Sequence, residues 1–557
     1  MESTKRNYTD SSVEGTGEGH RYASSFKEQL TIRGIITGAF GSIIITTSSM
    51  YVALRMGSLP WPIIFVALLS MAVLKGLGRT NLNEINVTHT AMSAGSMVAG
   101  GLAFTIPGLW MLNQDVSISF WTLLTVTLSG TIMGVIFTAL VRKFFVEQEK
   151  LPYPMGVAAA ETVLTGDEGG SKAKTLFATL GLAAIFTAIR DGLGWIPGIW
   201  NSTALAANNI FFGFRFSLMN LGVGYIIGPF LTGVWFLGSV FSYFFLIPVG
   251  VAQGWFSDVE AANAFKDSLG IGLMVGTGAG ILFKGILPKA KQLYGPLISG
   301  KAVKQSDINL KWSPIMFAAV AFFLTTFTDM TLLASVLTIL GIWIMTAMSA
   351  SVTGQTSINP MEVFGIIILL VITFILDTTV IAAFLIAAVV AIACGLTGDV
   401  LNDFKSGNIL RTNPRAQIIS ESIGGIIGAV VSVIVLFVMH EAYGAMGPGT
   451  DLPAPQAYAV STMVGGLPDV TAFWAGLVIG IVLYVLNIPG MVLGLGIYLP
   501  MYISSTAFLG GLVAFIVSKV NKDKDTKERG LIVSSGLLGG EGVAGVAIAI
   551  IRVLTRG

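Results

Sequence analysis

Seven long stretches of the chain contain no Asp, Glu, Lys or Arg. They are residues 34–54, 56–74, 90–114, 116–141, 216–257, 330–361 and 470–518. A helix that spans a bilayer needs about 20 apolar residues, so the two longest stretches could each hold two spans. Their apolar positions are continuous, whereas the strands of a membrane β-barrel alternate between apolar and polar residues. The pattern therefore predicts an all-α polytopic membrane protein.

The same pattern predicts about sixteen hydrophobic segments in two repeated halves, some of them short enough to be re-entrant hairpins. The stretch MYVALRMGSLPWPII at 50–64 has a faint counterpart in SVTGQTSINPMEVFG at 351–365. We expect a polar cytoplasmic tail at 1–30 and one transmembrane domain at 31–556, with approximate halves 31–300 and 310–556. The expected segments are 33–53, 61–78, 88–109, 117–141, 175–195, 217–234, 235–253, 268–287, 313–328, 330–349, 361–377, 378–397, 417–439, 470–487, 491–518 and 530–555.

Composition supports this class and excludes others. The chain is 54% hydrophobic and 11% charged, with a net charge of +2 and a mean hydropathy of +0.80, whereas soluble proteins carry about 25% charged residues. It has one cysteine and three histidines, too few for disulfides or a transition-metal site. It lacks a P-loop and an HExxH motif. We expect no enzyme activity, no catalytic residues, no cofactor, no metal ligands and no nucleic-acid partner.

Basic residues are concentrated in three connectors, which by the positive-inside rule face the cytoplasm. The connector at 440–469 has no Lys or Arg and is predicted to be external. An even number of spans would place both termini in the cytoplasm, with the protein in the cell membrane. The basic residues are Arg142, Lys143 and Lys150; Lys284, Lys289, Lys291, Lys301, Lys304 and Lys311; and Lys519, Lys522, Lys524, Lys527 and Arg529.

Proline and glycine interrupt several apolar segments. A broken helix is tolerated at membrane depth only where protein or water satisfies the freed backbone groups. LPYPMG at 151–156, SLPWPI at 58–63, SINPME at 357–362 and NIPGMVLGLG at 487–496 are therefore either cavity linings or interfacial turns. Side chains in and near these polar or broken stretches could hydrogen-bond a substrate. They are Asn86, Tyr153, Asn359, Tyr498 and Tyr502.

Titratable residues inside apolar segments are costly and by default mark a substrate or proton path. Glu161, Glu421 and Glu541 each follow or precede runs of small and apolar residues, and Glu84 and His89 head a helix rich in Gly, Ala and Ser. A desolvated carboxylic acid is suited to carry a proton or to contact a substrate amine. The alternative is that each belongs to a structural ion pair or reaches the membrane interface.

A charged sequence, GLTGDVLNDFKSGNILRTNP at 395–414, follows a charge-free stretch of membrane length. Asp399 and Asp403 are four residues apart and would share one face of a helix, and Lys405 follows closely. These three residues could bind a zwitterionic substrate or lock a gate through ion pairs. The alternative is an ordinary charged connector at 397–416.

Taken in order, these stretches resemble segments of the oligopeptide transporter (OPT) family. The resemblance extends over essentially the whole chain, from about residue 30 to 556. It rests on the combination of LPYPMG, of GDVLNDFKSG followed by TNPRAQ, and of SGLLGGE near the end. Asp399, Asp403, Lys405 and Gly407 match the family signature position by position.

The resemblance implies sixteen segments in repeated units, with uptake driven by the proton gradient. We predict proton-coupled symport of small oligopeptides by alternating access, with a peptide, protons and the lipid bilayer as partners. Import of metal chelates of the siderophore or nicotianamine type on the same fold stays open, as does a passive channel. A homodimer is compatible with the sequence.

Overall fold

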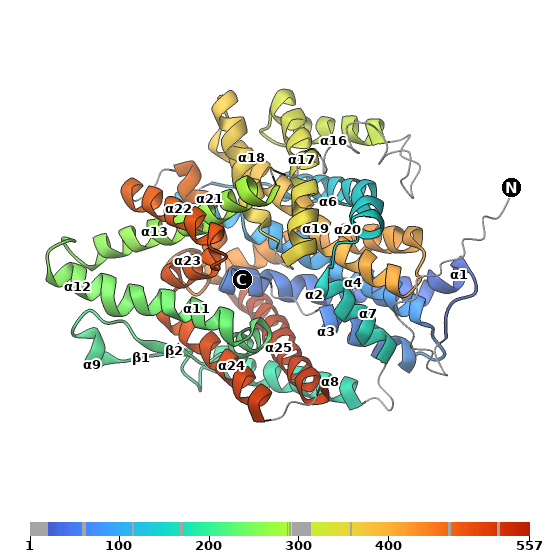
Figure 1. Cartoon of the computed structure of the whole chain (residues 1–557), viewed down its shortest axis with the longest axis horizontal. Helices are drawn as coiled ribbons and strands as arrows, with labels where there is room; N and C mark the ends of the chain where they lie inside the picture. Colours follow the sequence, from blue (N-terminus) through green and yellow to red (C-terminus); the bar gives the residue numbers. More distant parts are fainter. Residues whose placement is uncertain are drawn as a thin grey trace.

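The computed structural model describes residues 21–57, 59, 63–113, 116–165, 171–286, 288, 291, 313–356, 359–465, 469–520 and 524–556. Within these residues the chain is almost entirely helical, with one short antiparallel hairpin formed by β1 and β2 (Figure 1). Residues 1–20 of the predicted tail, much of the second basic connector, and parts of SLPWPI and SINPME lie outside the described residues.

The elements, with η for a π-helical segment, begin with α1 (Phe26–Gln29), α2 (Ile32–Met56), α3 (Ile63–Gly76), α4 (Leu82–Ala103), α5 (Pro107–Leu112), α6 (Phe120–Arg142), η1 (Lys143–Gln148), α7 (Pro154–Thr165), α8 (Ser171–Thr187), η2 (Ala188–Gly192), β1 (Ile199–Asn201), α9 (Thr203–Ala206), β2 (Gly213–Arg215), α10 (Leu218–Ile227), α11 (Pro229–Val240), η3 (Phe241–Leu246), α12 (Ile247–Ala252), α13 (Val259–Gly280) and η4 (Ile281–Ile286). They continue with α16 (Ser313–Phe327), α17 (Leu332–Thr356), α18 (Met361–Ile375), α19 (Val380–Ile409), α20 (Pro414–Tyr443), α21 (Pro455–Gly465), α22 (Val470–Val485), α23 (Gly490–Tyr498), α24 (Met501–Val520) and α25 (Lys524–Arg556).

Ten helical segments in the described part of the chain are long and apolar enough to cross a membrane, and six shorter apolar helices accompany them. This confirms the prediction of an all-α polytopic membrane protein. The division into two repeated halves stays a prediction.

Helix boundaries differ from the prediction where proline ends a helix. α10 stops before Gly228, which has a φ of +88°, and Pro229 starts α11, whereas the sequence predicts the break after residue 234. Pro500 separates α23 from α24, where a single segment is predicted at 491–518. Proline supplies no N–H for the helical hydrogen bond. Two further helices, α7 and α21, form where the sequence predicts a broken stretch and an external connector.

Helix α19 continues through the charged sequence and corrects the predicted connector at 397–416. Its N-terminus is capped by the side chain of Thr379, and it ends only at Ile409. Arg411 then has a φ of +57°, and Asn413 caps the next helix, α20, which has Pro414 in its first turn. Only this short turn is non-helical, so Asp399 and Asp403 lie on a helix.

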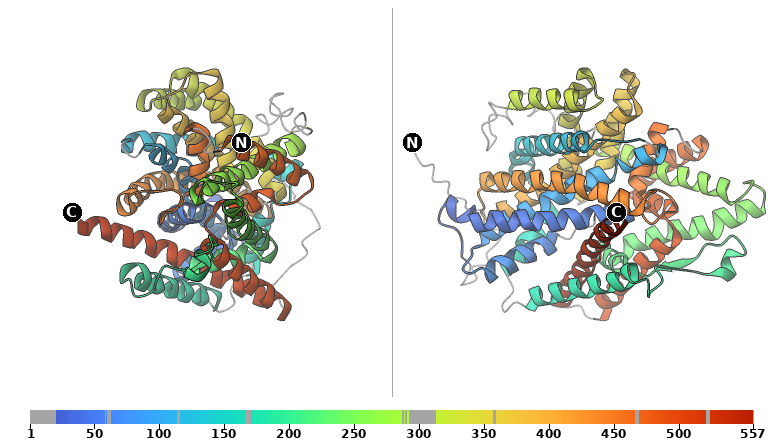
Figure 2. Two further views of the ribbon diagram at one scale, coloured as in Figure 1. Left: turned by 90° about the vertical axis from the view of Figure 1, so that its left-hand side faces the viewer. Right: turned by 180° about the vertical axis from the view of Figure 1, so that it is seen from behind.

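Helices α2, α4 and α20 run parallel and in contact, as Figures 1 and 2 show. Glycines permit the close approach: Gly38 of α2 packs against Ala91 of α4, and Gly424 of α20 packs against the Ala91 carbonyl. Small residues at such crossings are typical of helix packing in membranes. α19 runs antiparallel to α4, because Asn83 contacts Leu410 and Ser93 contacts Asp403.

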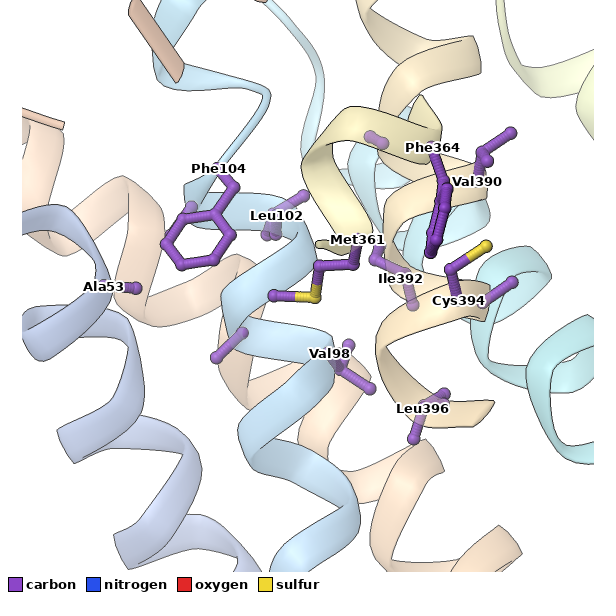
Figure 3. Packing of buried hydrophobic residues seen from close by; sticks show 14 of the residues in the cluster. Ala53, Val98, Leu102, Phe104, Met361, Phe364, Val390, Ile392, Cys394 and Leu396 are labelled. Carbon is purple, nitrogen blue, oxygen red and sulfur yellow. The ribbon is translucent and has the colours of Figure 1, made fainter. Parts of the chain in front are cut away.

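The apolar core lies between these helices and α18. Figure 3 shows Met361 of α18 between Leu102 of α4 and Ile392 of α19. All three side chains are at most 2% exposed. Van der Waals packing of this kind drives the association of helices in lipid, and it fixes α4 against α19 next to the charged sequence.

Helices α2 and α25 contact each other through their C-terminal halves. Gly542 packs against Ser48 and Gly545 against Tyr51, so residue numbers rise in the same direction along both helices. Both helices are long enough to cross a membrane. The placement of both termini in the cytoplasm stays a prediction.

Candidate functional site

Charged residues of α19 and α20 meet in the interior of the protein. Asp399 and Asp403 lie one turn apart on α19, and Glu421 lies on α20. One carboxyl oxygen from each residue lies within 4.8 Å of the other two. Asp403 and Glu421 are fully buried, and Asp399 is partly buried. We call these three residues the carboxylate cluster.

Helix α4 adds polar side chains to the carboxylate cluster. Ser93 Oγ donates a 2.6 Å hydrogen bond to Asp403 Oδ2, and His89 Nε2 lies 3.5 Å from Asp403 Oδ1. His89 and Ser93 are four residues apart and therefore share a face of α4. A histidine ring and a hydroxyl group thus meet one carboxyl group in the interior.

Hydrogen bonds around Asp403 join the three helices. Gln417 Nε2 of α20 and Ser406 Oγ of α19 donate to the Asp403 carbonyl oxygen, at 2.7 and 2.9 Å. Asn86 Nδ2 of α4 donates to Ser406 Oγ at 2.7 Å. The position of the carboxylate cluster is therefore tied to the packing of α4, α19 and α20.

Several polar atoms here have no hydrogen-bond partner among the described residues. They are both carboxyl oxygens of Glu421, both ring nitrogens of His89, Asp403 Oδ1, Asp399 Oδ2 and Asn86 Oδ1. Buried polar atoms are nearly always hydrogen-bonded, and the exceptions call for an explanation such as a bound ion, a water or a catalytic role. Their concentration at one point indicates a binding site for a small polar or charged species.

The chemistry of the donors narrows the choice of that species. Three ionised carboxylates this close repel one another, so protons or a cation must compensate their charge. Carboxylate oxygens are ligands for hard cations, and the distances would allow one. The absence of metal ligands, expected from the scarcity of histidine and cysteine, stays a prediction.

Glu84 is a structural residue in this geometry. Its carboxylate accepts hydrogen bonds from Thr31 Oγ1, from Thr80 Oγ1 and from Arg33 Nε and Nη2, at 2.6 to 2.7 Å. Asn81 caps the start of α4 by accepting from the Glu84 N–H. Both carboxylate oxygens accept hydrogen bonds from other side chains, and these bonds join the start of α2 to the start of α4.

Replacing Glu84 by glutamine is expected to destabilise the protein by about 1–3 kcal/mol, because it removes charge-assisted hydrogen bonds. Thermal unfolding in detergent measures this, with Glu441→Gln at an exposed position as the control. The uptake driven by a pH gradient that the sequence predicts should keep its dependence on that gradient, per folded molecule. Loss of that dependence with unchanged stability would contradict the structural role.

Two predicted site residues lie away from the carboxylate cluster. Glu161 is exposed on α7, so the desolvated setting expected for it is not present. Lys405 donates from Nζ to the carbonyl oxygen of Leu151 at 3.0 Å. Lys405 therefore holds the LPYP turn, and it forms no ion pair with Asp399 or Asp403. A role of these three residues in a gate or a substrate site stays a prediction.

The predicted substrate-lining residues are scattered. Tyr153 Oη donates to the Ala350 carbonyl, and the Asn359 amide donates to the carbonyl oxygens of Cys394 and Gly395. Both side chains therefore already have hydrogen-bond partners within the protein. The remaining two, Tyr498 and Tyr502, belong to α23 and α24. Tyr498 is buried, its hydroxyl has no partner among the described residues, and its ring stacks on Tyr458 with centroids 5.5 Å apart. Tyr502 is partly buried. Of the five lining residues, only Asn86 lies at the carboxylate cluster.

Glu541 lies in a second charged region. Its carboxylate accepts from Arg190 Nη1 at 3.0 Å, from Ser217 Oγ at 2.8 Å and from the Met219 N–H at 2.9 Å. Arg190 also pairs with Asp191 at 2.6 Å. The structural ion pair that the sequence left open is therefore present at Glu541.

The chain is similar to known proteins along most of its length. The family model described as OPT oligopeptide transporter protein matches residues 29–552. A Haemophilus influenzae protein named as an oligopeptide transporter is 29% identical, over 90% of this chain and 92% of its own. The metal-nicotianamine transporter YSL3 of Arabidopsis thaliana is 24% identical, over 82% of this chain and 79% of its own. A rice protein named as metal-nicotianamine transporter YSL5 is also 24% identical, over 76% and 74%.

Proposed function

The chain belongs to the OPT oligopeptide transporter family, and from this premise we propose that it is a proton-coupled symporter that imports small oligopeptides by alternating access. The observation that carries the proposal is the carboxylate cluster. Three carboxyl groups converge inside the protein, and both oxygens of the fully buried Glu421 have no partner among the described residues. A membrane protein has few reasons to keep such groups other than to carry an ion or proton.

The arrangement suggests how a proton would couple to movement. Protons at the carboxylate cluster cancel the repulsion between α19 and α20, and their release restores it. Because Asp403 is held by side chains of both α4 and α20, the charge of the cluster acts on the packing of all three helices. A proton can drive transport only if it binds the outward-facing and inward-facing states with different affinity.

The substrate is supported by the relative from Haemophilus influenzae, which is named as an oligopeptide transporter and is similar along nearly its whole length. Relatives named as metal-nicotianamine transporters support import of metal chelates as the second candidate. The three basic connectors support a cell-membrane orientation with the start of α2 in the cytoplasm.

Uptake into proteoliposomes would test the proposal. The purified protein is reconstituted and a pH gradient, acidic outside, is imposed in the presence of labelled di- to pentapeptides or of an iron chelate. A sodium gradient without a pH gradient serves as a separate arm, because the carboxylate cluster could also hold a cation. We expect peptides to accumulate only with the pH gradient and a protonophore to abolish this.

Other outcomes would change the proposal in distinct ways. Accumulation of the chelate alone would select the metal-chelate candidate. Accumulation with the sodium gradient would replace the proton as the coupling ion. Equilibration without accumulation under either gradient would contradict symport and favour a passive channel.

A further inference from the structure

A cavity of about 270 Å³ lies where the C-terminal ends of α2, α20 and α25 meet. Four of its lining residues are arginines and two are aspartates, so the walls carry an excess of two positive charges. The lining residues are Arg55, Arg190, Asp191, Gly198, Ile199, Arg215, Tyr443, Asp451 and Arg552. We call this space the arginine cavity. Its volume is slightly below the range of about 300–1,000 Å³ typical of small-molecule sites.

Arg55 supplies an unused donor group to the arginine cavity. It is 4% exposed, and its guanidinium lies over the Tyr51 ring, 4.6 Å from the ring centroid. Its Nε and Nη1 atoms have no hydrogen-bond partner within the described part of the chain. Leaving buried charged donors without a partner is costly, which points to a ligand that accepts from them.

Arg215 supplies the second unpaired charge. It ends β2, where Thr506 fixes its backbone by accepting from the Arg215 N–H at 3.0 Å and donating to its carbonyl at 2.9 Å. The side chain is 6% exposed and forms no ion pair with any described residue. Burial first, and then the charge of Arg55, lower the pKa of Arg215 from its ordinary value to about 10. It remains a cation at neutral pH, in a place that disfavours cations.

The other two arginines are already engaged. Arg190 pairs with Asp191 and Glu541, and Arg552 donates to the Asp191 carbonyl at 3.0 Å. Asp451 is exposed. Arg55 and Arg215 are therefore the two lining arginines whose side chains form neither a hydrogen bond nor an ion pair with any described residue.

We propose that the arginine cavity binds carboxylate groups of the transported molecule, with Arg55 and Arg215 as the two residues that contact them. The proposal rests on the proposed function, which supplies a substrate that bears carboxylates. A planar guanidinium matches a carboxylate in two parallel hydrogen bonds. The carboxylate belongs either to a peptide terminus or to a metal chelate.

The arginine cavity is separate from the carboxylate cluster. Glu421 and the cavity-lining Tyr443 are both on α20, and 22 helical residues correspond to about 33 Å. The cavity also lies at the end of α20 that leads into the connector without Lys or Arg, which the positive-inside rule places outside the cell. An importer takes up its substrate from that side.

Direct binding to the purified full-length protein, without any gradient, would test the site. Calorimetry compares trialanine with C-terminally amidated trialanine, which lacks the carboxylate, and with the iron(III) complex of EDTA, which has several. We expect trialanine to bind about 10- to 100-fold more tightly than its amide. Arg55→Gln and Arg215→Gln should remove this preference, whereas Lys75→Gln, at an exposed position, should keep it.

The outcomes separate this inference from the proposed function. Tight binding of the chelate instead of the peptide, lost in both arginine variants, would support the site with a chelate as the source of carboxylate. Equal binding of trialanine and its amide, with no binding of the chelate, would overturn the inference. This comparison uses only the unmodified protein, so it does not depend on whether the variants fold. A preference that survives in Arg55→Gln and Arg215→Gln would overturn it too. A carboxylate preference without gradient-driven uptake would disprove symport and leave the site in place.

Discussion

Replacing Glu421 by glutamine is expected to abolish accumulation of substrate against its gradient while leaving equilibration intact. One coupled proton moving down a gradient of one pH unit releases about 1.4 kcal/mol, which sustains about tenfold accumulation of a neutral substrate. Glutamine keeps the size of the side chain but cannot bind and release the proton. The accumulation ratio in proteoliposomes should therefore fall about tenfold for each coupled proton that is lost.

Two control variants make this result specific. Glu441 lies on the same helix but is exposed, so Glu441→Gln should accumulate substrate like the unmodified protein. Glu161→Gln tests the sequence-based hypothesis in the same assay, and its exposed position predicts nearly normal coupling. Exchange of labelled for unlabelled substrate without a gradient should persist in Glu421→Gln. Full accumulation by Glu421→Gln would exclude Glu421 as the proton carrier.

The membrane class and most helices could be predicted because they depend on local composition. A stretch without charges and of sufficient length has only one stable form in lipid. The side chains at positions 399 and 403 could also be predicted to share a face, since this follows from helical spacing. What remained open was whether the helix extends that far, because charged residues look the same in a connector and in a buried polar site.

Partners between distant segments could not be read from the sequence. Glu84, Glu421 and Glu541 are all candidates for a proton or substrate site from the sequence, yet Arg33 neutralises the first and Arg190 the third. Of the three, only Glu421 keeps unsatisfied oxygens. Nothing in the sequence marks Ser93 and Gln417 as site residues, because serine and glutamine are common near helix ends and crossings. Arg55 could have been noticed in the sequence, because it is the only charged residue between the charge-free stretches 34–54 and 56–74.

Replacing Gly424 by alanine is expected to destabilise the protein and disrupt the carboxylate cluster together. A methyl group at this position would overlap the backbone carbonyl oxygen of Ala91, and backbone in a packed helix cannot turn aside. α20 would have to move away from α4, carrying Glu421 away from His89. Overpacking of this kind costs about 1–3 kcal/mol, measured as a lower melting temperature in detergent.

The neighbouring glycine provides the control for Gly424→Ala. A methyl group on Gly425 would meet only Thr131 Cγ2, at 2.8 Å, and a side chain can adjust where a backbone cannot. Gly425→Ala should therefore lower both the melting temperature and the uptake less than Gly424→Ala does. If the two variants have the same melting temperature, the close crossing of α4 and α20 does not limit stability. If Gly424→Ala loses stability but keeps gradient-driven accumulation, the spacing of these helices is not what positions the carboxylate cluster for coupling.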